Sequence, residues 1–107
     1  MDEFIMVYMT AANRGEAVRI GRDLVEGRLA ACVNVIGDAT SIYRWRGQVE
    51  EAGEVVFVAK TQRTLFERLA ARVRELHSYD TPCIVAYPMS HGTAPYLAWL
   101  RDATTED

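Results

Sequence analysis

Residues 30–61 read AACVNVIGDATSIYRWRGQVEEAGEVVFVAKT. β-Branched and apolar residues fill both ends of this stretch, which predicts two strands. A turn signal at residues 46–48 lies between them, and Gly37 interrupts the first strand. We therefore expect a long β-hairpin with a bend or bulge at Gly37 and with Tyr43 and Trp45 near its tip.

The segments on either side of the hairpin complete a regular order of elements. Residues 4–10 form an apolar run typical of a covered strand. A helix follows, in which Asn13 caps the N-terminus and Glu16 returns the bond as in a capping box. Thr64 and Glu67 give the same signature for a second helix. Behind it we expect a short strand and a terminal helix, over residues 83–87 and 93–103.

This order predicts an α+β fold of the ferredoxin-like, split βαβ type (βαββαβ plus a C-terminal helix). Both main helices lie on one face of the sheet in such a fold, and the second and fourth strands form its opposite edges. Cys32 and Cys83 would then lie too far apart for a disulfide within the chain.

Composition limits the class of protein. The 107 residues are 50% hydrophobic and 25% charged, which suits one domain spanning residues 1–107. The net charge of -3 argues against nucleic-acid binding. No apolar run approaches the roughly 20 residues that span a bilayer, and the acidic start does not resemble a signal peptide. We therefore expect a cytoplasmic protein with no nucleic-acid or membrane partner.

The sequence contains no recognisable catalytic motif, so candidate site residues come from the ends of the expected elements. His77 ends the second helix beside Tyr79 and Asp80, and an imidazole next to a carboxylate is typical of a divalent-metal site or a proton-transfer site. The alternative is that His77 only caps the last carbonyls of its helix.

Two soft donors are also candidates. Cys32 could give a thiolate to copper(I), and Met9, at the end of its strand, could give a thioether sulfur. Packing is the alternative for both residues, and we expect Met6 rather than Met9 to be the core methionine. Lys60, the only lysine, ends the third strand; it could bind an anion or extend into water.

Aromatic side chains near the hairpin tip predict an interface. Tyr43 and Trp45 lie two residues apart and therefore on one strand face. A sheet covered on one face only invites burial against another copy of the chain, and interfaces are enriched in aromatic residues. We expect these two rings, with Trp99 of the terminal helix, to contact another subunit.

The order of several motifs resembles the CutA family of divalent-cation tolerance proteins. The motifs that carry the resemblance are residues 29–34, residues 41–47, Glu54, Lys60-Thr61, residues 77–82, Gly92 and residues 96–99. The resemblance implies a homotrimer built like the PII signalling proteins, with the hairpin reaching onto a neighbour. It further implies tolerance of copper and other divalent ions, no enzymatic activity and no obligatory cofactor.

Two positions depart from the family pattern. Ser78 stands where the family usually has proline, which loosens the turn between His77 and Tyr79. Met9 stands where some bacterial relatives have cysteine, and a thioether favours copper(I) over zinc or copper(II). A metal site inherited from such relatives would therefore be softer and weaker.

Three functional hypotheses follow. The first is a trimer that binds copper or another divalent cation at clefts between subunits, with His77 and either Met9 or Cys32 as ligands and Lys60, Tyr79 and Asp80 as neighbours. The second is a PII-like signalling or interaction module that binds a small anionic metabolite or a protein partner. The third and weakest is an enzyme with Cys32 as its nucleophile.

Overall fold

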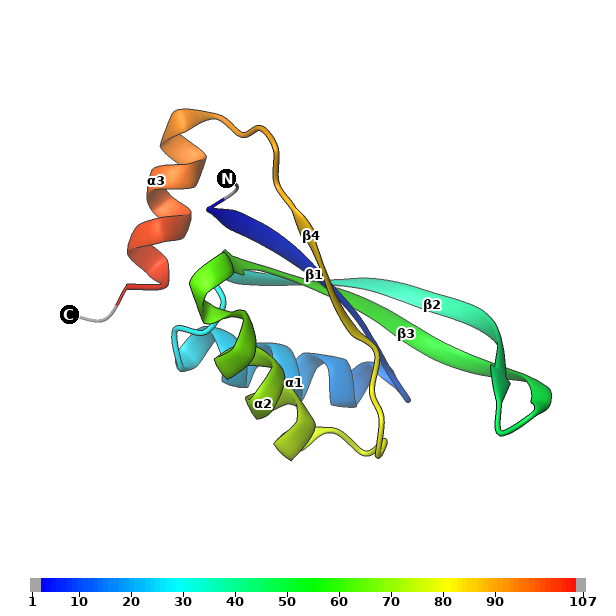
Figure 1. The fold of residues 1–107 in the computed structure, drawn as a ribbon. Helices are drawn as coiled ribbons and strands as arrows, with labels where there is room; N and C mark the ends of the chain where they lie inside the picture. Colours follow the sequence, from blue (N-terminus) through cyan, green and yellow to red (C-terminus); the bar gives the residue numbers. More distant parts are fainter. Residues whose placement is uncertain (1–2, 106–107) are drawn as a thin grey trace.

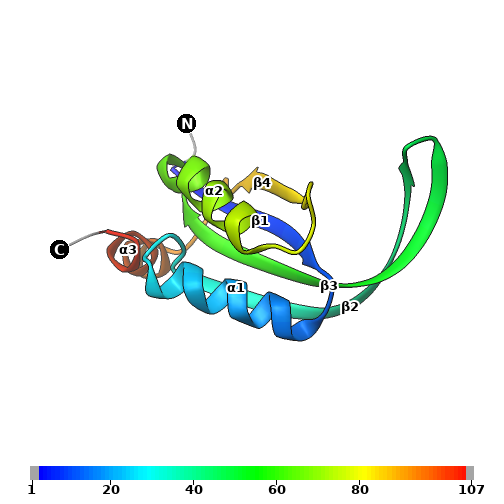
Figure 2. The ribbon, with the colours of Figure 1, turned by 90° about the horizontal axis from the view of Figure 1, so that it is seen from below.

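A computed structural model describes residues 3–105. The elements, in chain order, are β1 (Phe4–Ala11), α1 (Arg14–Glu26), β2 (Cys32–Trp45), β3 (Gln48–Gln62), a 3-10 turn (Arg63–Leu65), α2 (Phe66–Leu76), β4 (Ile84–Pro88) and α3 (Ala94–Ala103). The strands form an antiparallel sheet in the order β2-β3-β1-β4. Both α1 and α2 cover one face of it, and α3 lies at the end where β1 begins (Figures 1 and 2). The ferredoxin-like prediction is confirmed.

The β2–β3 hairpin extends well beyond the helices (Figure 2), and the chain measures 44 × 25 × 23 Å along its principal axes. The pairing register shifts between Val35 and Gly37, where Gly37 has a φ of 145°. At the tip, Arg46 and Gly47 have φ values of 52° and 81°, as a tight two-residue hairpin turn requires. The predicted bulge and turn are therefore both confirmed.

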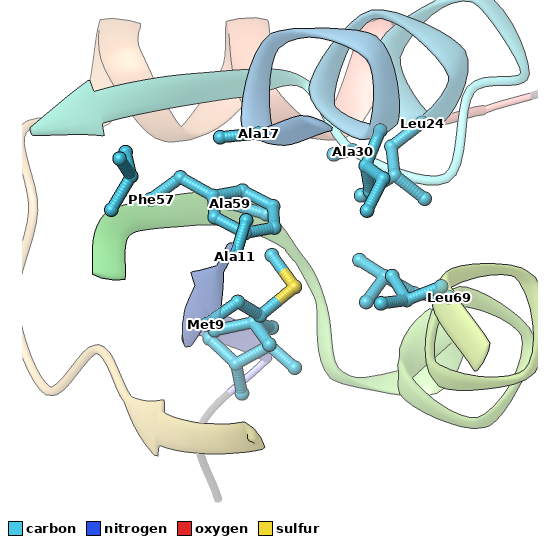
Figure 3. Close-up of a cluster of buried hydrophobic side chains, with 13 residues drawn as sticks. Met9, Ala11, Ala17, Leu24, Ala30, Phe57, Ala59 and Leu69 are labelled. Carbon is cyan, nitrogen blue, oxygen red and sulfur yellow. The ribbon is translucent and has the colours of Figure 1, made fainter. Parts of the chain in front are cut away.

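The core lies between the sheet and the two helices that cover it. Its largest fully buried side chains include Phe57, Ile20 and Leu69. Met9 is also fully buried there, with its sulfur among these apolar side chains (Figure 3). Met6 lies on the opposite face of β1 and is 38% exposed. The expectation that Met6 rather than Met9 is the core methionine was wrong.

The two helix starts differ. Asn13 caps α1 as predicted, because its side chain accepts a 2.9 Å hydrogen bond from the Glu16 N–H. The Glu16 carboxylate, however, accepts from the N–H of Ala12 rather than from that of Asn13. The capping box predicted at Thr64 is absent: α2 starts at Phe66 behind the 3-10 turn, with no side-chain cap.

Cys32 and Cys83 lie at opposite edges of the sheet, since β2 and β4 are its outer strands. Cys32 is the first residue of β2, and Cys83 immediately precedes β4. Both are free thiols, as the predicted topology required.

Gly21 marks a close approach of α1 to β2. A methyl group at this position would lie 2.9 Å from Cγ1 of Val33, and the branched valine side chain has little freedom to move away. We expect Gly21→Ala to lower the free energy of unfolding by about 1–2 kcal/mol, because overpacking outweighs the better helix propensity of alanine. Urea unfolding measures this, and Gly21→Ala introduced into a Val33→Ala background should cost less. Equal costs in both backgrounds would contradict the packing explanation.

Candidate functional site

His77 is a buried residue at the centre of a hydrogen-bond network. Its side chain is 0% exposed. The Nε2 atom lies 2.8 Å from the carbonyl oxygen of Thr10, and Nδ1 accepts a 3.1 Å hydrogen bond from the N–H of Tyr79. A carbonyl only accepts, so Nε2 carries the proton. To bind a metal, His77 would have to give up one of these two bonds.

The same network ties α1 to the segment after α2. The side chain of Glu16 is 4% exposed and accepts hydrogen bonds from the N–H groups of Ala12 and Ser78, at 2.9 and 2.8 Å. Burial acts to raise the pKa of Glu16, but these hydrogen bonds and the nearby His77 outweigh it and hold the pKa below the ordinary value of 4.5. Glu16 is therefore a buried carboxylate that is stable in its charged form.

The other two predicted metal ligands lie elsewhere. Met9 is in the core under the helices. Cys32 lies opposite Lys60 in the β2–β3 register, and its sulfur is 3.7 Å from the hydroxyl of Tyr96 on α3. The structure does not bring these two sulfur atoms together with His77. Across residues 3–105, no three side chains among His, Cys, Asp and Glu converge as a metal site would require.

Lys60 belongs to the group around Tyr96. Its ammonium lies 3.5 Å from the Tyr96 hydroxyl and 5.7 Å from the centre of that ring. Burial and the hydrogen bond to Cys32 raise the pKa of Tyr96, against the opposing effect of Lys60. This group lies at the α3 end of the sheet, away from Tyr79 and Asp80.

A cleft of about 480 Å³ joins the hairpin to the loop between α2 and β4, a volume typical of small-molecule sites. Its lining includes two predicted neighbours of the site, Tyr79 and Asp80, and two predicted interface rings, Tyr43 and Trp45. The other lining residues are Thr10, Arg46, Glu50, Glu54, Thr81 and Cys83. The structure thus brings together residues that the sequence had assigned to separate roles.

The cleft is acidic. Glu50, Glu54 and Asp80 contribute three carboxylates against the single guanidinium of Arg46. Burial and a hydrogen bond to Glu54 raise the pKa of Tyr79 to about 12, so Tyr79 remains a neutral phenol. Burial and the charge of Glu54 also raise the pKa of the Cys83 thiol. A cation would therefore meet three carboxylates, a phenol and a protonated thiol.

Glu50, Glu54 and Cys83 were not predicted as site residues. Glu50 and Glu54 lie four residues apart on β3, so their side chains share one face of the strand. Glu50 pairs with Tyr43 across the hairpin. The alternation of residue types could have indicated this shared face, but only the three-dimensional path of the loop places Tyr79 and Cys83 beside it.

The predicted interface rings are only half covered in the chain. Tyr43 is 40% exposed, Trp45 42% and Trp99 45%. The sheet face opposite α1 and α2 also carries exposed apolar side chains, among them Val85 and Tyr87. The contacts that would cover them in an assembly stay a prediction.

Fold and cleft together define a ferredoxin-like α+β protein with one open sheet face and an acidic, ring-lined cleft beside it. The chain belongs to the CutA1 divalent ion tolerance protein family, whose model matches residues 5–103. Within residues 3–105, no helix has both the length and the apolar character needed to cross a membrane.

Relatives at similar identity come from distant organisms. "Divalent-cation tolerance protein CutA" of Thermus thermophilus is 44% identical over 104 residues, covering 97% of this chain and 99% of that protein. "Protein CutA" of Homo sapiens is 44% identical over 97 residues, covering 91% of this chain and 54% of that protein. The chain therefore spans about half the length of the human relative. The name of the Thermus thermophilus relative describes a tolerance protein and mentions no enzymatic activity.

Solved structures agree with this assignment. The divalent cation tolerance protein from Thermus thermophilus has a TM-score of 0.93 at 44% identity, covering 95% of this chain and 99% of that chain. A CutA from Archaeoglobus fulgidus, described as periplasmic, has a TM-score of 0.92 at 36% identity, with coverage of 95% and 99%.

Proposed function

We propose that this protein acts in divalent-cation tolerance as a cytoplasmic, non-enzymatic homotrimer that binds copper or another divalent cation at clefts between subunits. Family membership supports the tolerance role. The observation that carries the binding proposal is the excess of carboxylates in the cleft beside the hairpin. Such an excess attracts cations and repels the anionic metabolites of the second hypothesis.

The ligand set is completed, in this proposal, by a neighbouring subunit. One chain does not bring three suitable donors together within its described residues, and divalent metals bound by proteins need several. The hairpin is the element that reaches furthest from the body of the chain (Figure 2). Its contact with another copy would bring further donors to the cleft and cover the exposed rings of Tyr43 and Trp45.

Assembly is tested by analytical ultracentrifugation at micromolar concentration. We expect a trimer for the unmodified chain and a weaker one for Trp45→Ala, because buried aromatic anchors carry much of the energy of an interface. The matched control is Arg44→Ala, since Arg44 neighbours Trp45 on the other strand face and should alter assembly less. A stable monomer of the unmodified chain would contradict the proposal.

Metal binding is tested by calorimetric titration of the assembled protein with copper(I), copper(II) and zinc. Asp80→Asn and Glu54→Gln should each weaken binding about tenfold or more, because each removes a charged ligand or a close countercharge. The control Glu51→Gln makes the same charge change at an exposed position that does not line the cleft. Unchanged affinity in both cleft variants would exclude this cleft as the metal site.

A further inference from the structure

The outer surface of α1 carries an open hollow bordered by three arginines, Arg14, Arg19 and Arg22. Its volume is about 700 Å³. The other lining residues are Gly15, Val18, Asp23 and Glu26. All three arginines are exposed, and within residues 3–105 none of their guanidinium groups forms a hydrogen bond or an ion pair. They are therefore free to bind an anionic group.

The acidic residues of this lining offset the positive charge only in part. Asp23 accepts two 2.8 Å hydrogen bonds from Arg72 of α2, and these bonds hold the pKa of Asp23 below its ordinary value. The charge of Asp23 is thus matched by that of Arg72, which leaves Glu26 to balance the three arginines of the hollow. The hollow is therefore positive in a chain whose net charge is -3.

A second, smaller hollow continues the first one toward the sheet. The two hollows share Val18, Arg22 and Glu26. The second has a volume of about 310 Å³ and is otherwise lined by Gly21, Val25, Val33 and Val35. Val25 is 38% exposed, so part of this valine-lined floor faces solvent. A ligand that combines negative charges with an apolar side chain would match both hollows.

This surface is not the one that we expect an assembly to cover. The rings of Tyr43 and Trp45 belong to the hairpin, which extends beyond the helices (Figure 2). The exposed side chains of Val85 and Tyr87 lie on the sheet face opposite α1 and α2. None of these four residues lines either hollow. Contacts between copies through the hairpin and the open sheet face would therefore leave the α1 surface accessible.

The range of electrostatic forces favours a short acidic segment over an extended polyanion. Charges are screened over about 8 Å at physiological ionic strength, so a short segment in the hollow interacts mainly with the nearby arginines. Seven of the twelve basic residues lie in α1, the 3-10 turn and α2, which leaves the rest of the chain strongly acidic. A nucleic acid or an anionic membrane is larger than the hollow and would also meet this repelling remainder.

We propose that the α1 surface docks an acidic segment of another protein. Carboxylates of the segment pair with Arg14, Arg19 and Arg22, since a guanidinium can bind a carboxylate through two parallel hydrogen bonds. One apolar side chain of the segment packs between Val25 and β2. The docking needs neither a metal ion nor the cleft beside the hairpin, so this proposal and the proposed function can fail separately.

The probe is a fluorescent peptide of three Glu-Glu-Leu-Asp repeats, titrated into the unmodified protein by fluorescence anisotropy with a chelator present. We expect saturable binding that weakens as salt is added. Arg19→Ala and Arg22→Ala should each weaken it about two- to fivefold, as expected for exposed charge pairs. The matched control Arg74→Ala removes the same charge from an exposed position on α2 outside both hollows and should leave binding unchanged. Equal weakening by all three variants would indicate nonspecific attraction and overturn the proposal.

The apolar contact and the class of partner are tested with further ligands. A peptide with serine in place of leucine should bind about fivefold more weakly, because it has no side chain to bury against the valines. Co-sedimentation with phosphatidylglycerol vesicles should show weaker binding than the leucine peptide does. Absence of peptide binding, equal binding of the serine peptide, or tighter binding to vesicles would each overturn the proposal. Circular dichroism and sedimentation show that each variant is folded and assembled.

Discussion

Glu16→Ala is expected to lower the free energy of unfolding by about 3 kcal/mol. The substitution removes two hydrogen bonds to a charged acceptor, each worth roughly 1.5–3 kcal/mol. It also leaves the N–H groups of Ala12 and Ser78, which donate to that carboxylate at 2.9 and 2.8 Å, without their partner. Ala12 and Ser78 belong to segments far apart in the sequence. Loss of the two hydrogen bonds should therefore loosen the contact between the start of α1 and the loop after α2.

Urea unfolding at neutral pH measures this effect. Glu26→Gln is the matched control, because Glu26 is an exposed carboxylate at the other end of α1 and should change stability by less than about 0.5 kcal/mol. Glu16→Gln keeps one acceptor oxygen and should fall between the control and Glu16→Ala. A Glu16→Ala variant as stable as the Glu26→Gln control would contradict the network described here.

The Glu16 contribution should depend on pH in one direction. Its pKa is lower in the folded chain than the ordinary 4.5, so the unfolded chain binds the proton more readily. The stabilisation is therefore present above about pH 4.5 and is lost as the pH falls through the folded pKa. Stability curves of the unmodified chain and Glu16→Gln should approach each other below pH 4.5. A difference that grows on acidification would reverse the sign and refute the explanation.

His77→Ala is expected to lower the free energy of unfolding by about 3 kcal/mol and to leave copper affinity unchanged. The ring is fully buried, so its removal leaves a cavity. The Thr10 carbonyl and the Tyr79 N–H also lose their hydrogen bonds. Both ring nitrogens already have protein partners, which is why we expect a structural role.

A second variant separates packing from hydrogen bonding. His77→Phe fills much of the volume but restores neither bond, so it should cost about 1–3 kcal/mol. Copper titration is carried out on each variant under conditions where circular dichroism shows it folded. Weakened copper binding by a folded His77 variant would instead establish the ligand role that the sequence first suggested.

Local patterns predicted the fold well because its signals are local. Three signals each determine the structure of the residues around them: the apolar run of β1, the turn at Arg46 and Gly47, and the interruption at Gly37. Strand alternation places Met6 and Met9 on opposite faces of β1, as the structure shows. It did not indicate which face meets the helices, because that depends on how α1 and α2 pack against the finished sheet.

The cleft was harder to predict because it joins two segments by tertiary structure alone. Tyr79 and Asp80 were chosen for their proximity to His77, and Tyr43 and Trp45 were chosen as interface rings. Only the folded loop brings these pairs together. Likewise, nothing in the sequence near His77 indicated that the Thr10 carbonyl would occupy its ring nitrogen.

The register shift in β2 determines which way the outer hairpin faces. Val35 pairs with Phe57 and Gly37 with Val56, so Ile36 is one surplus residue in the ladder. Odd-numbered residues face the helices before it and turn to the opposite side after it. Ile36 is 66% exposed and should tolerate almost any replacement. Deleting it would join Val35 directly to Gly37 in a regular ladder and would leave the outer pairs, Tyr43 with Glu50 among them, in register. The extra residue therefore sets the local bend and twist of β2, and with them the direction in which the hairpin leaves the sheet, rather than the pairing within the hairpin.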